Sequence, residues 1–122
     1  MRVLLLKNLT DAVGRKYSQE ELLAELIKLD SPLLGEIRTS NTDLSVDLSR
    51  VSHQISNIRF DDSVNLFGDI EFLSTPMGEI VKSAIEAGAN VRYGIRAFGY
   101  VDKDLNVTDL NLVTFDVIFN NK

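Results

Sequence analysis

The sequence has 122 residues, of which 44% are hydrophobic and 25% are charged, and its formal net charge is −5. These values are ordinary for one globular domain with a buried core, and we expect a single domain over residues 1–122. The absence of cysteine excludes disulfides, thiolate metal sites and a cysteine nucleophile. The negative charge argues against non-specific binding to nucleic acid, which depends on a basic surface.

A short apolar run, Val3 to Leu6, lies near the start between Arg2 and Lys7. It is much shorter than the roughly 20 apolar residues that span a bilayer. It also lacks the small-residue cleavage site that follows a signal peptide. We therefore expect a buried strand here, and neither a processed leader nor a membrane partner.

A first helix is predicted to begin at Ser18, because Ser18 and Glu21 have the spacing of a capping box. Apolar residues then recur at helical spacing and form one stripe, made of Leu22, Leu23, Leu26 and Ile27. The run Asp30 to Pro32 predicts the end of this helix.

A second helix is predicted after Thr75, a candidate N-cap that is followed by Pro76 at the first helical position. Its apolar stripe consists of Ile80, Val81, Ala84 and Ile85. Gly88 suits the left-handed position just beyond the end of a helix.

The rest of the chain is typical of strands joined by turns. Alternating apolar residues predict strands over Leu66 to Phe72 and Val113 to Phe119, with acidic residues and Thr114 on the opposite faces. Less regular patterns predict strands over 54–60 and 91–100. The runs 61–63 and 102–104 are typical of hairpin turns. Two helices among about six short strands predict an α+β fold with a largely antiparallel sheet or barrel.

Several short segments, together with their order and spacing, carry a family resemblance. They are Gly14–Ser18, Leu34–Glu36, Val46–His53, Thr75–Gly78, Ala87–Ala89 and Leu112–Val117. Together they resemble the prohead (procapsid maturation) serine proteases of tailed phages, which are kin to the herpesvirus assemblin. The resemblance covers roughly residues 12–119 and implies a herpes-protease-like, mainly antiparallel β-barrel or sheet core with two flanking helices.

The resemblance implies peptide hydrolysis by a serine that a histidine activates. The family's serine pair followed by arginine corresponds here to Gly94, Ile95 and Arg96, and the family's histidine position falls at Thr39. We therefore expect a pseudoprotease with no catalytic residue. The alternative is an active capsid-maturation protease with a displaced triad that uses His53, the only histidine, for which a structural role is favoured. A lone histidine also argues against a zinc site, and no cofactor is expected.

If the fold is shared, the segments around the family's base and nucleophile face one another. This places Arg38, Thr39, Arg92, Tyr93 and Arg96 as candidate ligand-binding residues, because guanidinium groups bind carboxylate or phosphate and tyrosine offers a stacking face. The alternative is that the arginines form ordinary salt bridges. Strand alternation also places Tyr93 on the face opposite the two β-strand arginines, so these side chains need not converge.

Two binding roles follow for an inactive protein of this kind. One is a partner of capsid scaffold or assembly proteins, as a homo-oligomer. The other is a counter-defence protein that sequesters a small anionic, nucleotide-like signal in the former active-site cleft. The resemblance implies the cytoplasm of an infected bacterium or the inside of the procapsid. Family members carry additional chain beyond the last strand whereas this sequence ends at Lys122, which favours the stand-alone binder.

Overall fold

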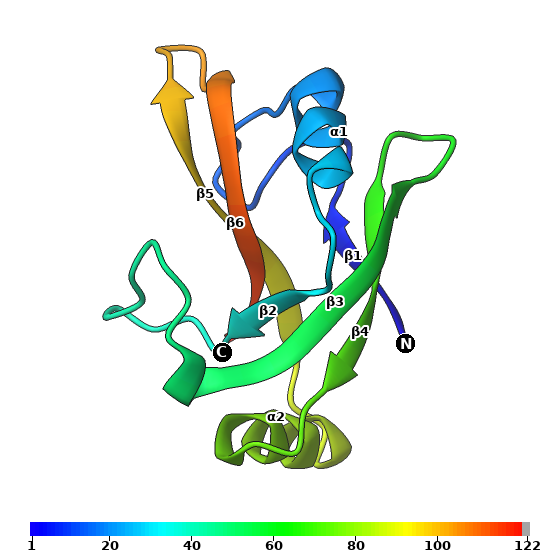
Figure 1. Ribbon diagram of the computed structural model, residues 1–122, viewed down its shortest axis with the longest axis vertical. Helices are drawn as coiled ribbons and strands as arrows, with labels where there is room; N and C mark the ends of the chain where they lie inside the picture. Colours follow the sequence, from blue (N-terminus) through cyan, green and yellow to red (C-terminus); the bar gives the residue numbers. More distant parts are fainter. Residues whose placement is uncertain (121–122) are drawn as a thin grey trace.

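The computed structural model describes residues 1–120 and contains two α-helices, one 3-10 helix and six strands (Figure 1). In chain order the elements are β1 (Arg2–Leu6), α1 (Gln19–Ile27), β2 (Leu33–Glu36), η1 (Leu48–Arg50), β3 (Val51–Phe60), β4 (Leu66–Phe72), α2 (Pro76–Glu86), β5 (Val91–Val101) and β6 (Val107–Phe119). The expected α+β class, a mainly antiparallel core with two helices, is confirmed.

The strands form two antiparallel units. One is a sheet in the order β1-β4-β3-β2, and the other is the long ribbon of β5 and β6. The two units join where β2 runs into β6, through a parallel bridge from Ile37 to Val117 and a 2.9 Å hydrogen bond from the Arg38 amide to the Val117 carbonyl. On the other side β1 and β5 lie next to each other. No backbone hydrogen bond joins these two strands in residues 1–120, so this side is an open seam.

The core lies between the sheet and the ribbon. Its fully buried members come from both strand units and from both helices, and include Leu22, Ile55, Leu66, Val81 and Phe115. The predicted alternation of β4 is present, since Leu66, Gly68 and Ile70 are buried while Glu71 is exposed. β6 differs from its prediction, because Thr114 and Asp116 on its polar face are also 0% exposed.

Both helices begin and end close to where the sequence predicts. The Ser18 hydroxyl accepts the Glu21 amide at 3.2 Å, and the Thr75 hydroxyl accepts the Gly78 amide at 3.0 Å. Gly88 follows α2 with a φ of 98°, which a glycine adopts without steric cost. No helix of residues 1–120 is long and apolar enough to cross a membrane.

Helix α1 also covers one edge of β6. The Glu21 carboxylate accepts the Leu110 amide at 2.8 Å, and the Glu25 carboxylate accepts the Leu112 amide at 2.9 Å. These bonds satisfy edge amides of β6, which begins at Val107 and not near Val113 as its alternation predicts. Sequence periodicity misses this part of the strand because an irregularity at Asp109, whose φ is 55°, interrupts the alternation and leaves Val107 and Leu110, three residues apart, both buried.

Candidate functional site

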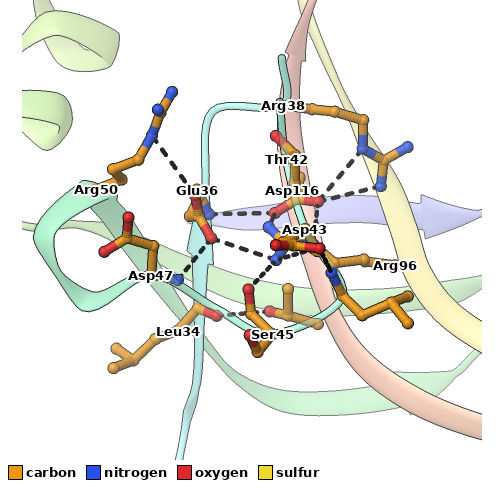
Figure 2. Close-up of polar contacts among 12 residues, drawn as sticks. Leu34, Glu36, Arg38, Thr42, Asp43, Ser45, Asp47, Arg50, Arg96 and Asp116 are labelled. Carbon is orange, nitrogen blue, oxygen red and sulfur yellow. Dashed lines mark hydrogen bonds and ion pairs between the residues drawn. The ribbon is translucent and has the colours of Figure 1, made fainter. Parts of the chain in front are cut away.

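An ionic cluster lies where β2, β5 and β6 meet (Figure 2). Glu36, Arg96 and Asp116 form its buried centre, and the half-exposed Arg38 and Arg50 lie at its border; we call these five residues the buried ionic cluster. Asp116 lies at its centre and is 0% exposed. The Arg96 guanidinium holds both Asp116 oxygens, with Nε at 2.9 Å and Nη2 at 2.5 Å. Charged hydrogen bonds of this two-pronged kind are among the strongest in proteins.

Arg96 also fastens the loop that follows β2. Its Nη1 donates to Glu36 Oε2 at 3.2 Å and to the carbonyls of Asp43 and Ser45 at 3.0 and 3.2 Å. Burial alone would lower the pKa of Arg96, but the hydrogen bonds and charge of Asp116 and Glu36 outweigh it and raise the pKa above its ordinary value. Arg96 is thus a buried structural cation, and all three of its nitrogens have protein partners.

Arg38 connects this cluster to the segment around Gly94, where the sequence resemblance places the family's nucleophile. Its Nε and Nη2 lie 3.3 and 3.2 Å from Asp116 Oδ2. The same Nη2 donates to the carbonyls of Gly94 and Ile95 at 3.0 and 2.8 Å. The segments around residues 38 and 94 therefore lie against each other.

Gly94, which the family resemblance places at the serine position, is buried, and a side chain there would require its neighbours to shift. A β-carbon on this residue would lie 2.5 Å from Cδ1 of Ile118 and 3.1 Å from Nη1 of Arg38. Ile95, the neighbouring candidate position, is 5% exposed and belongs to the core. The space beside the strand that a nucleophile would need is therefore filled by Ile118 and by the Arg38 guanidinium.

Thr39, which the family resemblance places at the histidine position, is exposed and lies in a turn. Its amide donates to the Thr42 hydroxyl at 2.8 Å, and its own hydroxyl accepts the Asn41 amide at 3.2 Å. These contacts are local to the loop, and none of them points toward Gly94.

His53 and Ser52 form a hydrogen-bonded pair, but both residues are 0% exposed. The Ser52 hydroxyl lies 2.7 Å from His53 Nδ1, and His53 Nε2 lies 2.8 Å from the Phe115 carbonyl. A carbonyl only accepts, so Nε2 carries the proton and Nδ1 accepts from Ser52. Burial lowers the pKa of His53 below its usual 6.5, despite the opposing effect of the Phe115 carbonyl. Gly35 leaves room for this imidazole, because a β-carbon there would collide with Nε2.

A groove of about 500 Å³ follows the open seam between β1 and β5. It is lined by Val3–Lys7, Thr10–Ala12 and Val91–Ile95. Tyr93 lies on the inner side of β5, where it packs against the core and burial raises its pKa. Arg92 is exposed at the outer side. The groove is therefore apolar along most of its length and basic near Arg92.

A smaller hollow of about 70 Å³ continues the groove at this basic end. We call it the arginine hollow, and its charged lining residues are Asp11, Arg15, Arg38 and Arg92. Asp11 Oδ2 is bound by Arg15 Nε at 2.7 Å and by the Tyr17 hydroxyl at 2.8 Å. Burial would raise the pKa of Asp11, but these two hydrogen bonds hold it below its ordinary value.

Comparison with solved structures finds a close match in architecture with the capsid assembly protease of bacteriophage T4, gp21. The TM-score is 0.76 and the sequence identity is 16%, over 98% of this chain and 81% of that chain. The chain has the fold of that capsid assembly protease. Comparison with models of protein families and with curated protein sequences finds no match. At this identity the likeness concerns the protease-like fold alone.

Within the protease-like fold, the five candidate binding residues separate into four places. Arg38 and Arg92 both line the arginine hollow beside Gly94, and Tyr93 lines the groove. Arg96 lies in the buried ionic cluster with all its nitrogens taken, and Thr39 lies in an exposed turn. The salt-bridge alternative therefore describes Arg96 and also Arg38, which pairs with Asp116 at 3.2 Å. The ligand-binding hypothesis is compatible with the positions of Arg92 and of the remaining Arg38 nitrogen.

Three acidic residues and one arginine were not anticipated by sequence reasoning. Glu36 and Asp116 anchor the buried ionic cluster, and Asp11 and Arg15 form the ion pair of the arginine hollow. Asp11 and Arg15 are four residues apart, so their spacing was a usable signal for a local pair. Asp116 gave no such signal, because alternation places it on the polar face of its strand. No group of His, Cys, Asp or Glu in residues 1–120 is arranged to hold a metal ion.

Proposed function

We propose that this protein is a catalytically inactive, prohead-protease-like phage protein that acts by binding. The observation that carries the proposal is the state of the nucleophile position. Gly94 has no hydroxyl, is buried, and has Ile118 and the Arg38 guanidinium in the space where a side chain would project. A serine protease needs an accessible hydroxyl within hydrogen-bond reach of a base.

The alternative is an active protease with a displaced triad, and its strongest candidate is the pair of Ser52 and His53. Their 2.7 Å contact is within the range for proton transfer from a nucleophile to its base. Both side chains are fully buried, however, and no protein chain can reach the Ser52 hydroxyl in this conformation. The geometry thus favours a structural role for this pair.

Two kinds of binding partner remain in the proposal, and a different observation supports each. The fold of a capsid assembly protease supports a role beside scaffold or assembly proteins. The basic end of the β1–β5 groove supports an anionic ligand, because Arg92 and Arg38 line it in a chain whose net charge is −5. Association into a homo-oligomer belongs to the first role, and sedimentation at several protein concentrations would measure it.

Hydrolysis assays test the proposal. The protein would be incubated with its cognate scaffold protein and with casein, and treated in parallel with a fluorophosphonate that labels active serines. We expect intact substrates and no labelling above a heat-denatured control. Cleavage that the fluorophosphonate blocks would overturn the proposal, and loss of that cleavage in Ser52→Ala would assign it to the displaced pair.

A further inference from the structure

We propose that the arginine hollow binds a phosphate group, carried by a ligand whose remaining part lies along the β1–β5 groove. This inference names the ligand class for the binding role proposed above and rests on that role. It concerns Arg15, Arg38 and Arg92, which come from three separate segments of the chain and line one small space.

The arginine hollow offers hydrogen-bond donors that have no protein partner in the described part of the chain. Within residues 1–120, Arg92 makes no hydrogen bond or ion pair, although its neighbour four residues on, Arg96, uses every nitrogen. Arg15 uses only Nε, and Arg38 uses Nε and Nη2. Terminal guanidinium nitrogens of all three side chains therefore remain available at the hollow.

The arginine hollow also carries more positive than negative charge. Three guanidinium groups line the hollow together with the Asp11 carboxylate, which Arg15 and Tyr17 already bind. Asp116, which also contacts Arg38, is held on both oxygens by Arg96. The hollow thus carries surplus positive charge, in contrast to the acidic chain as a whole. A phosphate monoester, with a charge of about −1.5 to −2 at neutral pH, matches this surplus better than a single carboxylate.

The arginine hollow has the size of a small anion and is continuous with the β1–β5 groove. The hollow measures about 70 Å³. Since a water molecule takes up about 30 Å³ of the liquid, this space suits a group of a few heavy atoms such as a phosphate. Asp11, Ala12, Arg92, Gly94 and Ile95 line both the hollow and the larger groove. A phosphate held in the hollow would therefore direct the rest of its ligand along β1 and β5.

The test is a titration of the isotope-labelled protein, followed by the amide NMR signals of Val13, Gly94 and Ile95, which line the hollow. The probes are inorganic phosphate, pyrophosphate, a nucleoside monophosphate and a cyclic dinucleotide, with citrate as a carboxylate probe. We expect all phosphate probes to shift these signals. A nucleotide that binds at least about tenfold more tightly than inorganic phosphate would identify the nucleotide as the source of the phosphate.

The decisive variant is Arg92→Gln, which removes one unpartnered donor and leaves the buried ionic cluster intact. Lys103→Gln is its charge-matched control, because Lys103 is exposed in the turn between β5 and β6. We expect Arg92→Gln to weaken phosphate binding about tenfold or more, and Lys103→Gln to leave it unchanged. Equal affinity in both variants, tighter binding of citrate than of phosphate, or no shift at about 10 mM phosphate would each overturn the proposal.

Assays of hydrolysis on the same samples separate this inference from the proposed function. Phosphate binding without proteolysis supports both. Phosphate binding in a protein that also cleaves scaffold overturns only the assignment as an inactive protease. Absence of both phosphate binding and proteolysis overturns only the phosphate site.

Discussion

Arg92 and Arg96 lie four residues apart on the same face of β5, yet they have opposite surroundings. Arg96 is 6% exposed and is held by Asp116, Glu36 and two loop carbonyls. Arg92 is exposed and has no ionic or hydrogen-bonded partner in residues 1–120. The residue type and the strand face are the same, so the difference comes from the elements packed over each position. β2, the following loop and β6 cover Arg96, whereas the open seam leaves Arg92 uncovered.

The comparison predicts that loss of the Asp116 charge, which holds Arg96, costs stability, whereas loss of the unpartnered Arg92 side chain does not. Removing charges from water is expensive, and only complete pairing offsets the cost. In residues 1–120 no buried side-chain nitrogen or oxygen lacks a hydrogen-bond partner. Four substitutions, ordered by expected effect, would break or sharpen this contrast.

Asp116→Asn should have the largest effect. It would leave Arg96 buried without its anionic partner, and we expect a loss of about 3–5 kcal/mol in the free energy of unfolding. Urea denaturation at neutral pH measures it. Asp104→Asn is the control, since Asp104 is exposed in a turn. A loss for Asp116→Asn no larger than for this control would mean that the cluster is not a structural centre.

Gly94→Ser tests how tightly the chain is packed at Gly94, which lies between the buried ionic cluster and the arginine hollow. The added β-carbon would come 2.5 Å from Cδ1 of Ile118, and we expect about 1–3 kcal/mol of destabilisation, as for other overpacked sites. Ala89→Ser, at an exposed position, is the control. In the double variant with Ile118→Ala, part of the loss should be recovered through coupling between the two sites. Gly94→Ser that is as stable as the control would show that the nucleophile position is open.

The pH dependence of stability tests whether His53, which is bound to the Phe115 carbonyl, is buried in its neutral form. Its pKa is lowered in the folded protein, so the unfolded chain binds a proton more readily below pH 6.5. Stability should therefore fall as the pH decreases from 7.5 to 5.5, by about 1 kcal/mol. Chemical denaturation at both values measures the change, and His53→Gln should flatten the profile. A wild-type profile that is already flat would contradict the assignment.

Arg92→Gln should have the smallest effect on stability, within about 0.5 kcal/mol, as for other surface substitutions without partners. Thermal unfolding beside Lys103→Gln would measure it. A loss above about 1 kcal/mol would mean that Arg92 has a structural partner and would remove the contrast with Arg96.

Much of this fold was predictable because its signals are local. Ser18, Thr75 and Gly88 act through backbone groups within a few residues, and the structure confirms all three. The turns at 61–63 and 102–104 are confirmed in the same way, since Asp61 and Asp102 each accept amides of their own turn. The resemblance to the prohead proteases predicted how these elements assemble into one fold, which the patterns of the single elements could not predict.

The site was less predictable, because the burial of its side chains depends on which elements pack over them in the tertiary structure. β2 has four residues, too few to show a periodicity, and is a strand through its pairing with β3. Alternation predicts that Asp116 lies on a solvent-exposed face of its strand, but β2 and Arg96 pack over it and bury it. The sequence therefore placed Arg38, Arg92 and Arg96 in one region but could not separate the buried cation from the exposed one.

The two carboxylates that α1 extends to β6 occupy backbone amides at an edge of this strand. Glu21 and Glu25 occupy amides of Leu110 and Leu112, which a strand from another molecule would otherwise find free. A fragment or splice that removes α1 would expose a long β-ribbon edge to intermolecular pairing. We therefore expect helix α1 to hinder edge-to-edge pairing of β6 with other molecules.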